Sequence, residues 1–548
     1  MPTASASAPD LAGFRVQLEQ LLDGGDREAV VGAVLTLLES VVGDNTRLAG
    51  RLQAALRQLY RQKSEKISTE QLALFLAQLP KEDAALAQVA STDATDSQKA
   101  TTGEAEGLPA GDGKGAGRRG GKQGMPAHLR REVKVIPVAE AERACEGCGS
   151  AKQPMGTDPQ YLWAFKPAEI YIIEERREVL VCKTCEEGVV TAEGTIKAKD
   201  RARPDSSLIA QIITAKLRDC LPLYRQSEIF ERSGVRLAPS TLLDWYMLGA
   251  NLLEPLWQHA RYELLLAYLL SLDDTGMPVL DRDHPRGIKR GHIWTYVADQ
   301  GRVVFCDYSP DWKGSHALAV LADFKGRYIQ GDGYAGIDAH FARPGAPQRV
   351  GCMDHARRRF LAALDAKDLR AAIPVSLLKQ LYAVEREARE AGEDLVALHA
   401  RRQHFSRPLI QRLHEVIAKL QPNAVPKSPL GKAVTYAVNQ WPTLVVFLEE
   451  PRLPISNAHV ERLQRRTALG RKNYLFAGSD EGARCLAILT TIVSNCELAG
   501  APTFDYLHDV IAKIAAGWPA ARIAELMPRP WLLARSALTT AHEPAQQQ

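Results

Sequence analysis

The feature that most constrains the fold is a change of hydrophobic pattern after residue 262, where alternating apolar segments replace helical ones. The strand-like segments LLSLDD and GMPVLD come first, and HIWTYVADQGRVVFCDY follows with Asp299-Gln300-Gly301 at its hairpin turn. A helical segment, GSHALAVLADF, separates them from RYIQGD and APQRVGCM, two further strand-like segments, and the last of these leads into the helical HARRRFLAAL. The pattern therefore predicts a mixed α/β sheet with helices between its later strands.

This order of elements is that of an RNase H-like (retroviral integrase-like) core, so we expect a multidomain α/β protein built around one. Residues 361–450 are mostly helical and predict an insertion into that core. Helices at about 457–469 and 481–497 then close it, with Gly470 ending the first of them. Residues 503–535 predict a helical tail.

Three carboxylates lie at related points of this pattern. Asp273 follows the first strand, Asp332 ends the fourth between two glycines, and Glu461 lies on the late helix SNAHVERLQRRTALG. In such a core the first and fourth strands end side by side, and a late helix can bring a third acid across from them. Three acids so arranged can hold two Mg²⁺ (or Mn²⁺) ions about 4 Å apart, which activate an oxygen to attack a phosphodiester.

Each acid alone is more typical of a turn or a helix cap, so the interpretation depends on the ordered set. The glycines beside Asp332 are likewise open to two interpretations. They either form a surface turn or let a DNA backbone approach the carboxylate.

Cations surround two of the predicted elements, and they predict contacts with DNA phosphates. They are Arg357 and Arg358 after the fifth strand, and Arg462, Arg465, Arg466, Arg471 and Lys472 around Glu461. A solvated charged face is the plainer alternative. Arg118 and Arg119, in the segment GAGRRGGKQG, either lie along phosphates or belong to a solvated tether.

Four of the nine cysteines form two CxxC pairs, Cys145 with Cys148 and Cys182 with Cys185. The spacing within each pair suits one structural, tetrahedral Zn²⁺ ion. The 33 residues between the pairs require a small β-structure to fill the gap. The odd number of cysteines favours a reduced, cytoplasmic protein over a disulfide framework.

The rest of the chain divides by composition. We expect the following regions: 1–86 helical with a basic second half, 87–132 a disordered basic linker, 133–200 zinc-binding, 201–262 helical and helix-turn-helix-like, 263–500 the catalytic core, and 501–548 the tail. Within the first region a coiled-coil heptad fits a positions Val31, Leu38, Asn45, Leu52 and Leu59 and d positions Val34, Val41, Leu48 and Ala55. Two shorter helices broken at 43–46 fit equally well.

Residues 222–250 predict a helix-turn-helix whose reading helix is 240–249. The alternative is a packed helical strut, because Leu242, Leu243, Trp245 and Tyr246 are bulky enough for a core.

Net charge is only +4, from 69 Lys and Arg against 65 Asp and Glu, so charge balance alone indicates no partner. Because no apolar run reaches about 18 residues, we expect no membrane contact. The start MPTASASAPD lacks the basic and apolar regions of a secretory signal.

Taken together, these motifs resemble those of the DDE transposases of the insertion sequence 66 type, which belong to bacterial mobile elements. YRQKSEKISTEQLALF resembles the family's basic N-terminal segment, and CEGCG and VCKTCEEGVVTA resemble its zinc-binding module. DDTGMPVLD, QGDGYAGI, HARRRF, NAHVER and GRKNYLFAGSDEGAR resemble the catalytic core. The resemblance covers about residues 47–531.

The resemblance implies that Asp273, Asp332 and Glu461 are the catalytic acids of a DNA transposase. Its partners would be double-stranded DNA, as element ends and as target, a second copy of the chain or more, and two small accessory proteins of the same element. The protein would be bacterial and cytoplasmic, and associated with the nucleoid when it is bound to DNA. An inactive or repurposed DNA-binding protein, or a nuclease without strand transfer, are the alternatives.

The sequence departs from the family pattern at four points. Asp274 stands in place of a glutamate, Asp354 in place of a small residue, SNAHVER in place of an Asp-Asn-Asn opening, and Tyr474 in place of a tryptophan. Asp354 is either a further metal ligand or a helix cap.

Overall fold

The computed structural model describes residues 67–79 and 204–541, together with short pieces at 20, 28, 30–32, 34–36, 170–171, 179–180 and 190–191. By its internal contacts the chain divides into two units, one of residues 1–94 with 175–548 and the other of residues 95–174. The four predicted zinc ligands Cys145, Cys148, Cys182 and Cys185, and the cations Arg118 and Arg119, lie outside the described residues. Two short antiparallel strands, β1 (Val179–Leu180) and β2 (Val190–Thr191), flank the second cysteine pair in the sequence.

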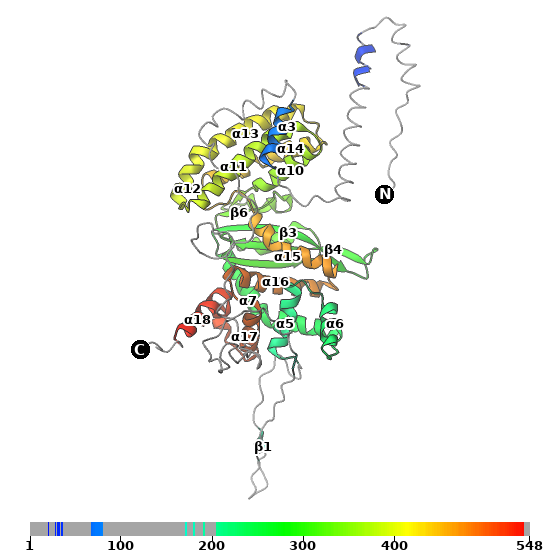
Figure 1. The fold of residues 1–548 in the computed structure, drawn as a ribbon, viewed down its shortest axis with the longest axis vertical. Helices are drawn as coiled ribbons and strands as arrows, with labels where there is room; N and C mark the ends of the chain where they lie inside the picture. The colour runs from blue at the N-terminus through cyan, green and yellow to red at the C-terminus, as the bar shows by residue number, and fades with distance from the viewer. Residues whose placement is uncertain are drawn as a thin grey trace, which may run out of the picture. The chain divides into compact units, whose positions relative to one another are not determined.

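A five-stranded mixed sheet forms the centre of the first unit (Figure 1). Its strands are β3 (Leu269–Leu280), β4 (Ile288–Ala298), β5 (Val303–Ser309), β6 (Tyr328–Gln330) and β7 (Gln348–Val350), in the order β5-β4-β3-β6-β7. The first three strands are antiparallel, whereas β6 and β7 run parallel to β3. The expectation that the first and fourth strands lie side by side is therefore confirmed.

The β3–β4 hairpin differs from the prediction in one respect. The first strand was expected to end at Asp273, but LLSLDD and GMPVLD form the single strand β3, because β4 pairs with it continuously from Leu270 to Leu280. The predicted turn that joins β4 to β5 is confirmed. Asp299 and Gln300 adopt φ values of +43° and +60°, the left-handed conformation that a tight hairpin turn requires.

Helices cover both faces of the sheet. They are α5 (Ser206–Leu217), α6 (Leu223–Arg232), α7 (Pro239–Leu265), α8 (Gly314–Leu321), α15 (Ala458–Tyr474), α16 (Asp480–Ala499), α17 (Thr503–Ala515) and α18 (Pro528–Ala541). The strands alternate in the usual way: Leu272 and Trp294 pack with α7 and α8, whereas Ile293 packs with Val460 of α15 and Leu486 of α16.

The region predicted as a helix-turn-helix shares its core with the sheet. The predicted reading helix, 240–249, is the first part of the 27-residue helix α7. Leu242 and Tyr246 are buried in the core, whereas Leu243 is 40% exposed. The packing of Leu242 and Tyr246 agrees with the strut interpretation, and DNA reading by this helix stays a prediction.

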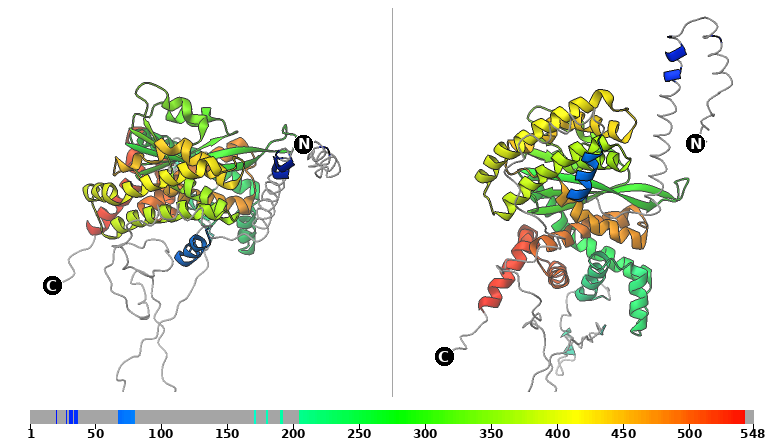
Figure 2. Two further views of the ribbon diagram at one scale, coloured as in Figure 1. Left: turned by 90° about the horizontal axis from the view of Figure 1, so that it is seen from above. Right: turned by 45° about the horizontal axis from the view of Figure 1, so that its top comes forward.

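The helical region after β7 builds a second hydrophobic core (Figure 2). Its helices are α10 (Met353–Asp365), α11 (Ala372–Glu390), α12 (Leu395–Arg401), α13 (Arg407–Leu420) and α14 (Pro429–Leu444). The N-terminal helix α3 (Thr69–Ala77) buries Leu72 in this core, and Lys379 of α11 donates a hydrogen bond to Thr69 (2.7 Å). A segment far from the insertion in sequence therefore packs on it.

Two details of helix ends were predicted wrongly. Gly470 does not end α15, because the helix continues to Tyr474 and stops where Leu475 turns to φ +64°. Asp354 does not cap α10, whose N-cap is Cys352. Instead its buried carboxylate accepts hydrogen bonds from Tyr382 of α11 (2.8 Å) and from Arg357 (3.3 Å), so it joins two helices of the insertion.

Of the predicted heptad positions, Val31 and Val34 lie among the described residues, in helical conformation, and are 57% and 37% exposed. The other heptad positions lie outside the described residues. Across the described part of the chain, we find no helix that combines the length and the apolar character required to cross a membrane.

Candidate active site

The neighbouring acids Asp273 and Asp274 on the central strand β3 have different surroundings. Because successive residues of a strand point to opposite faces, the two carboxylates separate. Asp274 accepts hydrogen bonds from His292 Nδ1 (2.5 Å) and Trp312 Nε1 (3.1 Å). Asp273 instead lies near Asp332 and Glu461, both of which act on its charge. The two acids therefore cannot exchange roles.

Asp332 is brought to Asp273 by strand pairing. In the parallel pair of β3 and β6, Ser271 lies opposite Gln330, and each acid follows two residues later. The loop after β6 is held from two sides. The Asp332 side chain accepts a hydrogen bond from the Tyr334 backbone N–H (2.9 Å), and its backbone carbonyl accepts one from the Tyr436 hydroxyl of α14 (2.8 Å). The insertion thus helps to position the second acid.

Glu461 lies in the first turn of α15, and that helix is anchored beside Asp273. Asn457, the residue before the helix, is fully buried and donates from Nδ2 to the carbonyl of Leu272 (3.3 Å). Its own backbone N–H points to Cys352 Sγ (3.4 Å) at the start of α10. One asparagine therefore links the strand of the first acid to the helix of the third.

The Glu461 carboxylate is occupied by a cation of the protein. Arg358 of α10 donates both of its terminal nitrogens to it, one at 2.8 Å, which makes a bidentate ion pair. His355 Nε2 lies 3.9 Å from the same carboxylate. Because of this pair, Glu461 does not extend toward the other two acids as a free ligand.

Burial and like charge raise the pKa of Asp273 to about 7. Burial is the larger cause, and the carboxylates of Asp332, Glu461 and Asp274 add to it, whereas the Asp274 backbone N–H opposes it. Nearby, burial lowers the pKa of His355, an effect that Asp332 and Glu461 oppose. Three carboxylates that act on the charge of Asp273 are thus concentrated at this edge of the sheet.

The donor set matches a hard divalent cation, because carboxylate oxygens are the ligands that Mg²⁺ and Mn²⁺ prefer. The present arrangement is closed, however. The crevice that Asp273 and Asp332 line has a volume of about 10 Å³, about the minimum for one water molecule. Across residues 67–79 and 204–541, no three His, Cys, Asp or Glu side chains are grouped closely enough to hold a metal. A metal held by all three acids therefore requires their carboxylates to move closer together.

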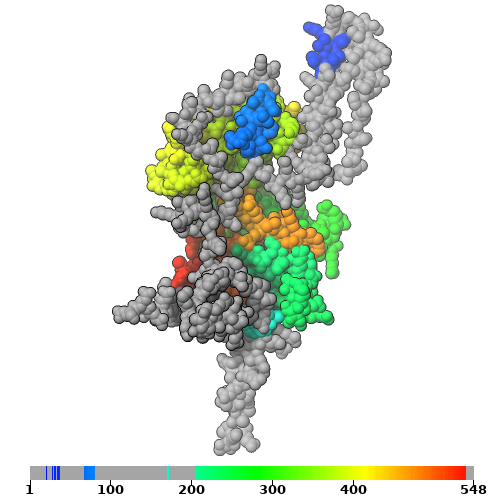
Figure 3. Space-filling view, viewed as in Figure 1, coloured from blue at the N-terminus to red at the C-terminus, as the bar shows by residue number. Residues whose placement is uncertain are grey.

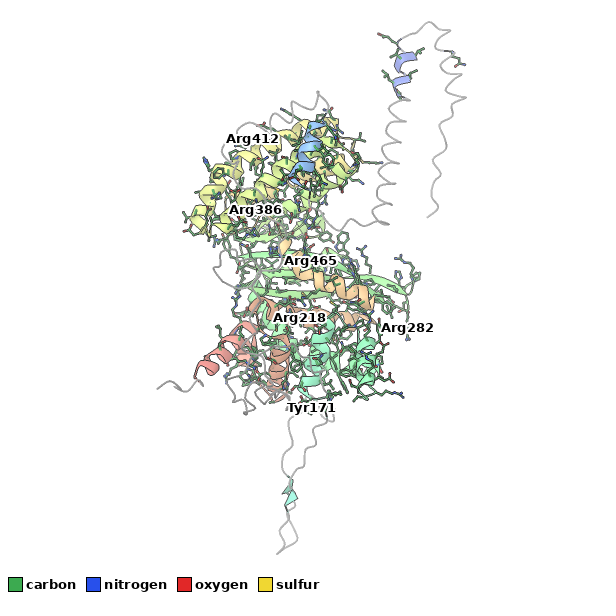
Figure 4. The ribbon with its side chains drawn as sticks, viewed as in Figure 1. Tyr171, Arg218, Arg282, Arg386, Arg412 and Arg465 are labelled. Carbon is green, nitrogen blue, oxygen red and sulfur yellow. The ribbon has the colours of Figure 1, made fainter. Side chains whose placement is uncertain are left out.

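Among the described residues, the cations predicted to contact DNA fall into two groups. Three of them are exposed on α15 and make no ion pair with any described residue: Arg462, Arg465 and Lys472. Part of α15 is visible in orange in Figure 3, and Figure 4 labels Arg465 on this helix. The others are engaged within the protein: Arg357 with Asp354, Arg358 with Glu461, Arg466 with Glu497 and Arg471 with a backbone carbonyl of β3.

Three residues of the site were not predicted from the sequence. They are His292, Trp312 and His355. His355 belongs to the HARRRF motif, so its position directly after the fifth strand could have suggested it. His292 and Trp312 carried no local signal, because they meet Asp274 only when β4 and the loop after β5 fold against β3.

The two glycines beside Asp332 have different structural requirements. Gly333 adopts φ +92°, and a Cβ there would lie 2.9 Å from the Gln440 side chain. At Gly331 an added Cβ would make only ordinary contacts, 3.6 Å from the carbonyl oxygen of Leu272. The turn interpretation therefore accounts for Gly333, and close approach of DNA remains an explanation for Gly331 alone.

Comparison with known proteins identifies the family of the chain. The model of the IS66 transposase family matches residues 201–485, just over half of the 548 residues. The chain belongs to the IS66 transposase family. The matched range includes all three acids of the site and ends within α16. A transposase-type function on DNA follows from this membership.

Two relatives of this IS66 transposase come from Sinorhizobium fredii (strain NBRC 101917 / NGR234). The uncharacterized protein y4hP is 30% identical over 439 residues, which cover 75% of this chain and 77% of y4hP. The uncharacterized protein y4jD is 29% identical over 411 residues, covering 72% of this chain and 78% of y4jD. No solved structure matches the chain.

The glycine pair yields a first prediction. Gly333→Ala is expected to lower the free energy of unfolding by about 1–2 kcal/mol, because an L-residue is strained at positive φ. Gly331→Ala is expected to change it by less than about 0.5 kcal/mol. Chemical denaturation of both variants measures the difference, and equal destabilisation by the two would contradict the backbone argument.

The raised pKa of Asp273 yields a second prediction. In metal-free buffer the folded protein holds a proton on Asp273 up to about pH 7, whereas in the unfolded chain the proton leaves near the ordinary value of 3.8. This carboxylate therefore makes the free energy of unfolding fall as the pH rises through that window. Asp273→Asn removes the effect and is expected to be more stable than wild type at pH 8 by on the order of 3–4 kcal/mol.

Denaturation of wild type and Asp273→Asn at pH 5 and pH 8 tests this difference. The amide oxygen of the variant can still accept the Asp274 backbone N–H that binds Asp273 Oδ1 (2.9 Å). The exposed Asp244→Asn on α7 serves as the control, for which we expect no change between the two pH values. A stability gap for Asp273→Asn that is equal at both pH values would refute the account of its charge.

Proposed function

We propose that this protein is a DNA transposase that cuts phosphodiesters at the ends of an insertion sequence and joins the freed 3′-hydroxyl to target DNA. The observation that supports the proposal is that Asp332, in the loop after β6, and Glu461, on α15, lie near enough to Asp273 on β3 to raise its pKa. Strand order supports an RNase H-like core, since the first and fourth strands are parallel neighbours. Family membership supports the reaction class.

In this proposal the three acids hold divalent metal ions, Mg²⁺ or Mn²⁺, two per site. The ions would stabilise charge on the attacking and leaving oxygens of an in-line displacement. Asp273 must lose its proton to act as a ligand, so the site works best above about pH 7 unless the metal lowers that value. Water and the 3′-hydroxyl attack phosphorus in the same geometry, so one site serves cutting and joining.

Arg358 has a defined part in this scheme. Its guanidinium neutralises Glu461 while the site is closed. Release of Glu461 would free a bidentate donor beside the acids, where the phosphates of DNA must come. Arg358 therefore exchanges a carboxylate for a phosphate, both of which fit its planar fork.

The remaining predicted features complete the proposal. Exposed Arg462, Arg465 and Lys472 on α15 would contact DNA phosphates. A zinc ion on Cys145, Cys148, Cys182 and Cys185 would fold a small domain. A dimer or larger assembly would hold two element ends together, aided by two small accessory proteins.

The test uses DNA from the flanks of the gene, where inverted repeats would mark the element ends. With Mg²⁺, wild type is expected to nick this DNA at the repeat ends, and Asp332→Ala is expected to lose at least about 10³-fold in rate, or roughly 4 kcal/mol of barrier. Asp323→Ala, which removes an exposed acid outside the site, is the control and should cut normally. Cutting by a folded Asp332→Ala would refute the assigned site.

The same DNA supplied as pre-cut ends separates the alternatives. A transposase joins such ends to a target plasmid, whereas a nuclease cuts but gives no joined product. An inactive, repurposed protein would bind the repeats and do neither. Circular dichroism of each variant confirms that loss of activity is not loss of fold.

A further inference from the structure

A groove opens from the acidic crevice along the β3–β4 hairpin. The groove has a volume of about 1000 Å³. Residues of both strands and of the loop between them line it, together with Trp312 and Arg471. Asp274 lines the groove and also the crevice that holds Asp273 and Asp332. A molecule bound along the groove therefore lies next to the crevice that Asp273 and Asp332 line. Figure 4 labels Arg282 in the loop that closes this hairpin.

The groove carries positive charge. Its cationic side chains are Arg286, Lys289, Arg290 and Arg471. Arg286 and Arg290 are exposed, and no carboxylate of the described chain pairs with either of them. Lys289 pairs with Asp480 (2.7 Å), whereas Arg471 donates to a neutral backbone carbonyl of β3 and so keeps its charge. The one acid in the lining, Asp274, already accepts from His292. Such a lining suits a phosphate backbone.

Trp312, between β5 and α8, places an aromatic surface at the inner end of this groove. The residue is 53% exposed, yet it is held from several directions. Its indole N–H donates to Asp274 (3.1 Å), and its carbonyl accepts from the Tyr334 hydroxyl (2.6 Å). The ring also stacks with His292 (centroids 5.7 Å apart, planes at 10°) and with Tyr334 (4.8 Å, 26°). The Trp312 ring is thus fixed in place by neighbouring side chains, while just over half of the residue stays exposed.

We propose that this groove binds a DNA strand beside the cleavage point and that an unpaired nucleobase stacks on Trp312. The inference rests on the proposed function. Phosphates would contact Arg286 and Arg290, and the base would cover the exposed part of the indole. Inside a duplex both faces of a base are covered by its neighbours, so the stacked base has to leave the helix. Asp274 is then a positioning residue, which holds the indole rather than a metal.

This proposal explains why two adjacent acids have separate partners. Asp273 serves the phosphodiester from one face of β3, and Asp274 orients the base platform from the other. The groove would recognise a distorted or frayed strand end in preference to intact duplex. Phosphate contacts alone would not discriminate between them, because they are the same in both.

The test measures binding without cleavage, with the full chain in buffer that contains no divalent metal. Binding is followed by the fluorescence of 2-aminopurine in two DNAs. One is a duplex with an unpaired 2-aminopurine near its end, and the other is the same duplex with that base paired. Trp312→Ala is expected to bind the unpaired DNA about tenfold more weakly than wild type and the paired DNA equally well. Trp312→Phe, which keeps an aromatic face, is expected to retain most of the affinity and of the 2-aminopurine quenching.

Tyr262→Ala is the matched control, because Tyr262 is 58% exposed and lies outside the groove lining. It should bind both DNAs as wild type does. Equal affinity of Trp312→Ala and wild type for the unpaired DNA would overturn the inference, and so would an equal loss on both DNAs. Absence of metal-dependent cleavage by wild type would refute the proposed function but would leave this binding result unaffected, so the two failures are distinguishable.

Discussion

The parallel pairing of β3 with β6 is the constraint on which the site depends. It aligns Ser271 with Gln330, and because the strands run in the same direction, the acids two residues later emerge at the same edge. Gln330 is fully buried, and its side chain donates to the carbonyl of Pro454 (2.8 Å), just before α15. The strand end that positions Asp332 therefore also fixes the approach to the helix that carries Glu461.

Bringing like charges together at a buried edge has an electrostatic cost. It appears in the pKa of Asp273, raised to about 7 by burial and by the other acids. The protein offsets part of this cost at Glu461, where Arg358 supplies a counter-charge. In the account proposed above, metal ions take over that role when DNA is bound. A buried carboxylate whose pKa is raised by burial and by neighbouring acids is typical of an active site.

Sequence patterns predicted that the first and fourth strands are neighbours, which the structure confirms. They also singled out the three acids, because strand ends and a helical carboxylate leave local signals. They did not predict the partners of those acids. Arg358 and Glu461 are 103 positions apart, and Trp312 and Asp274 are 38 apart, so both contacts depend on how the elements pack. The end of α15 was misjudged for a related reason: Gly470 is buried within the helix, whereas a Cβ-bearing residue, Leu475, adopts the left-handed turn.

The central claim is that Asp273, Asp332 and Glu461 together hold divalent metal when DNA is bound. Anomalous scattering at the manganese edge, from crystals of the protein grown with element-end DNA and Mn²⁺, tests it most directly. The account predicts manganese in contact with all three carboxylates, and the Arg358 guanidinium moved from Glu461 to a phosphate. Manganese absent from these acids, or Arg358 still paired with Glu461 beside cleaved DNA, would contradict it.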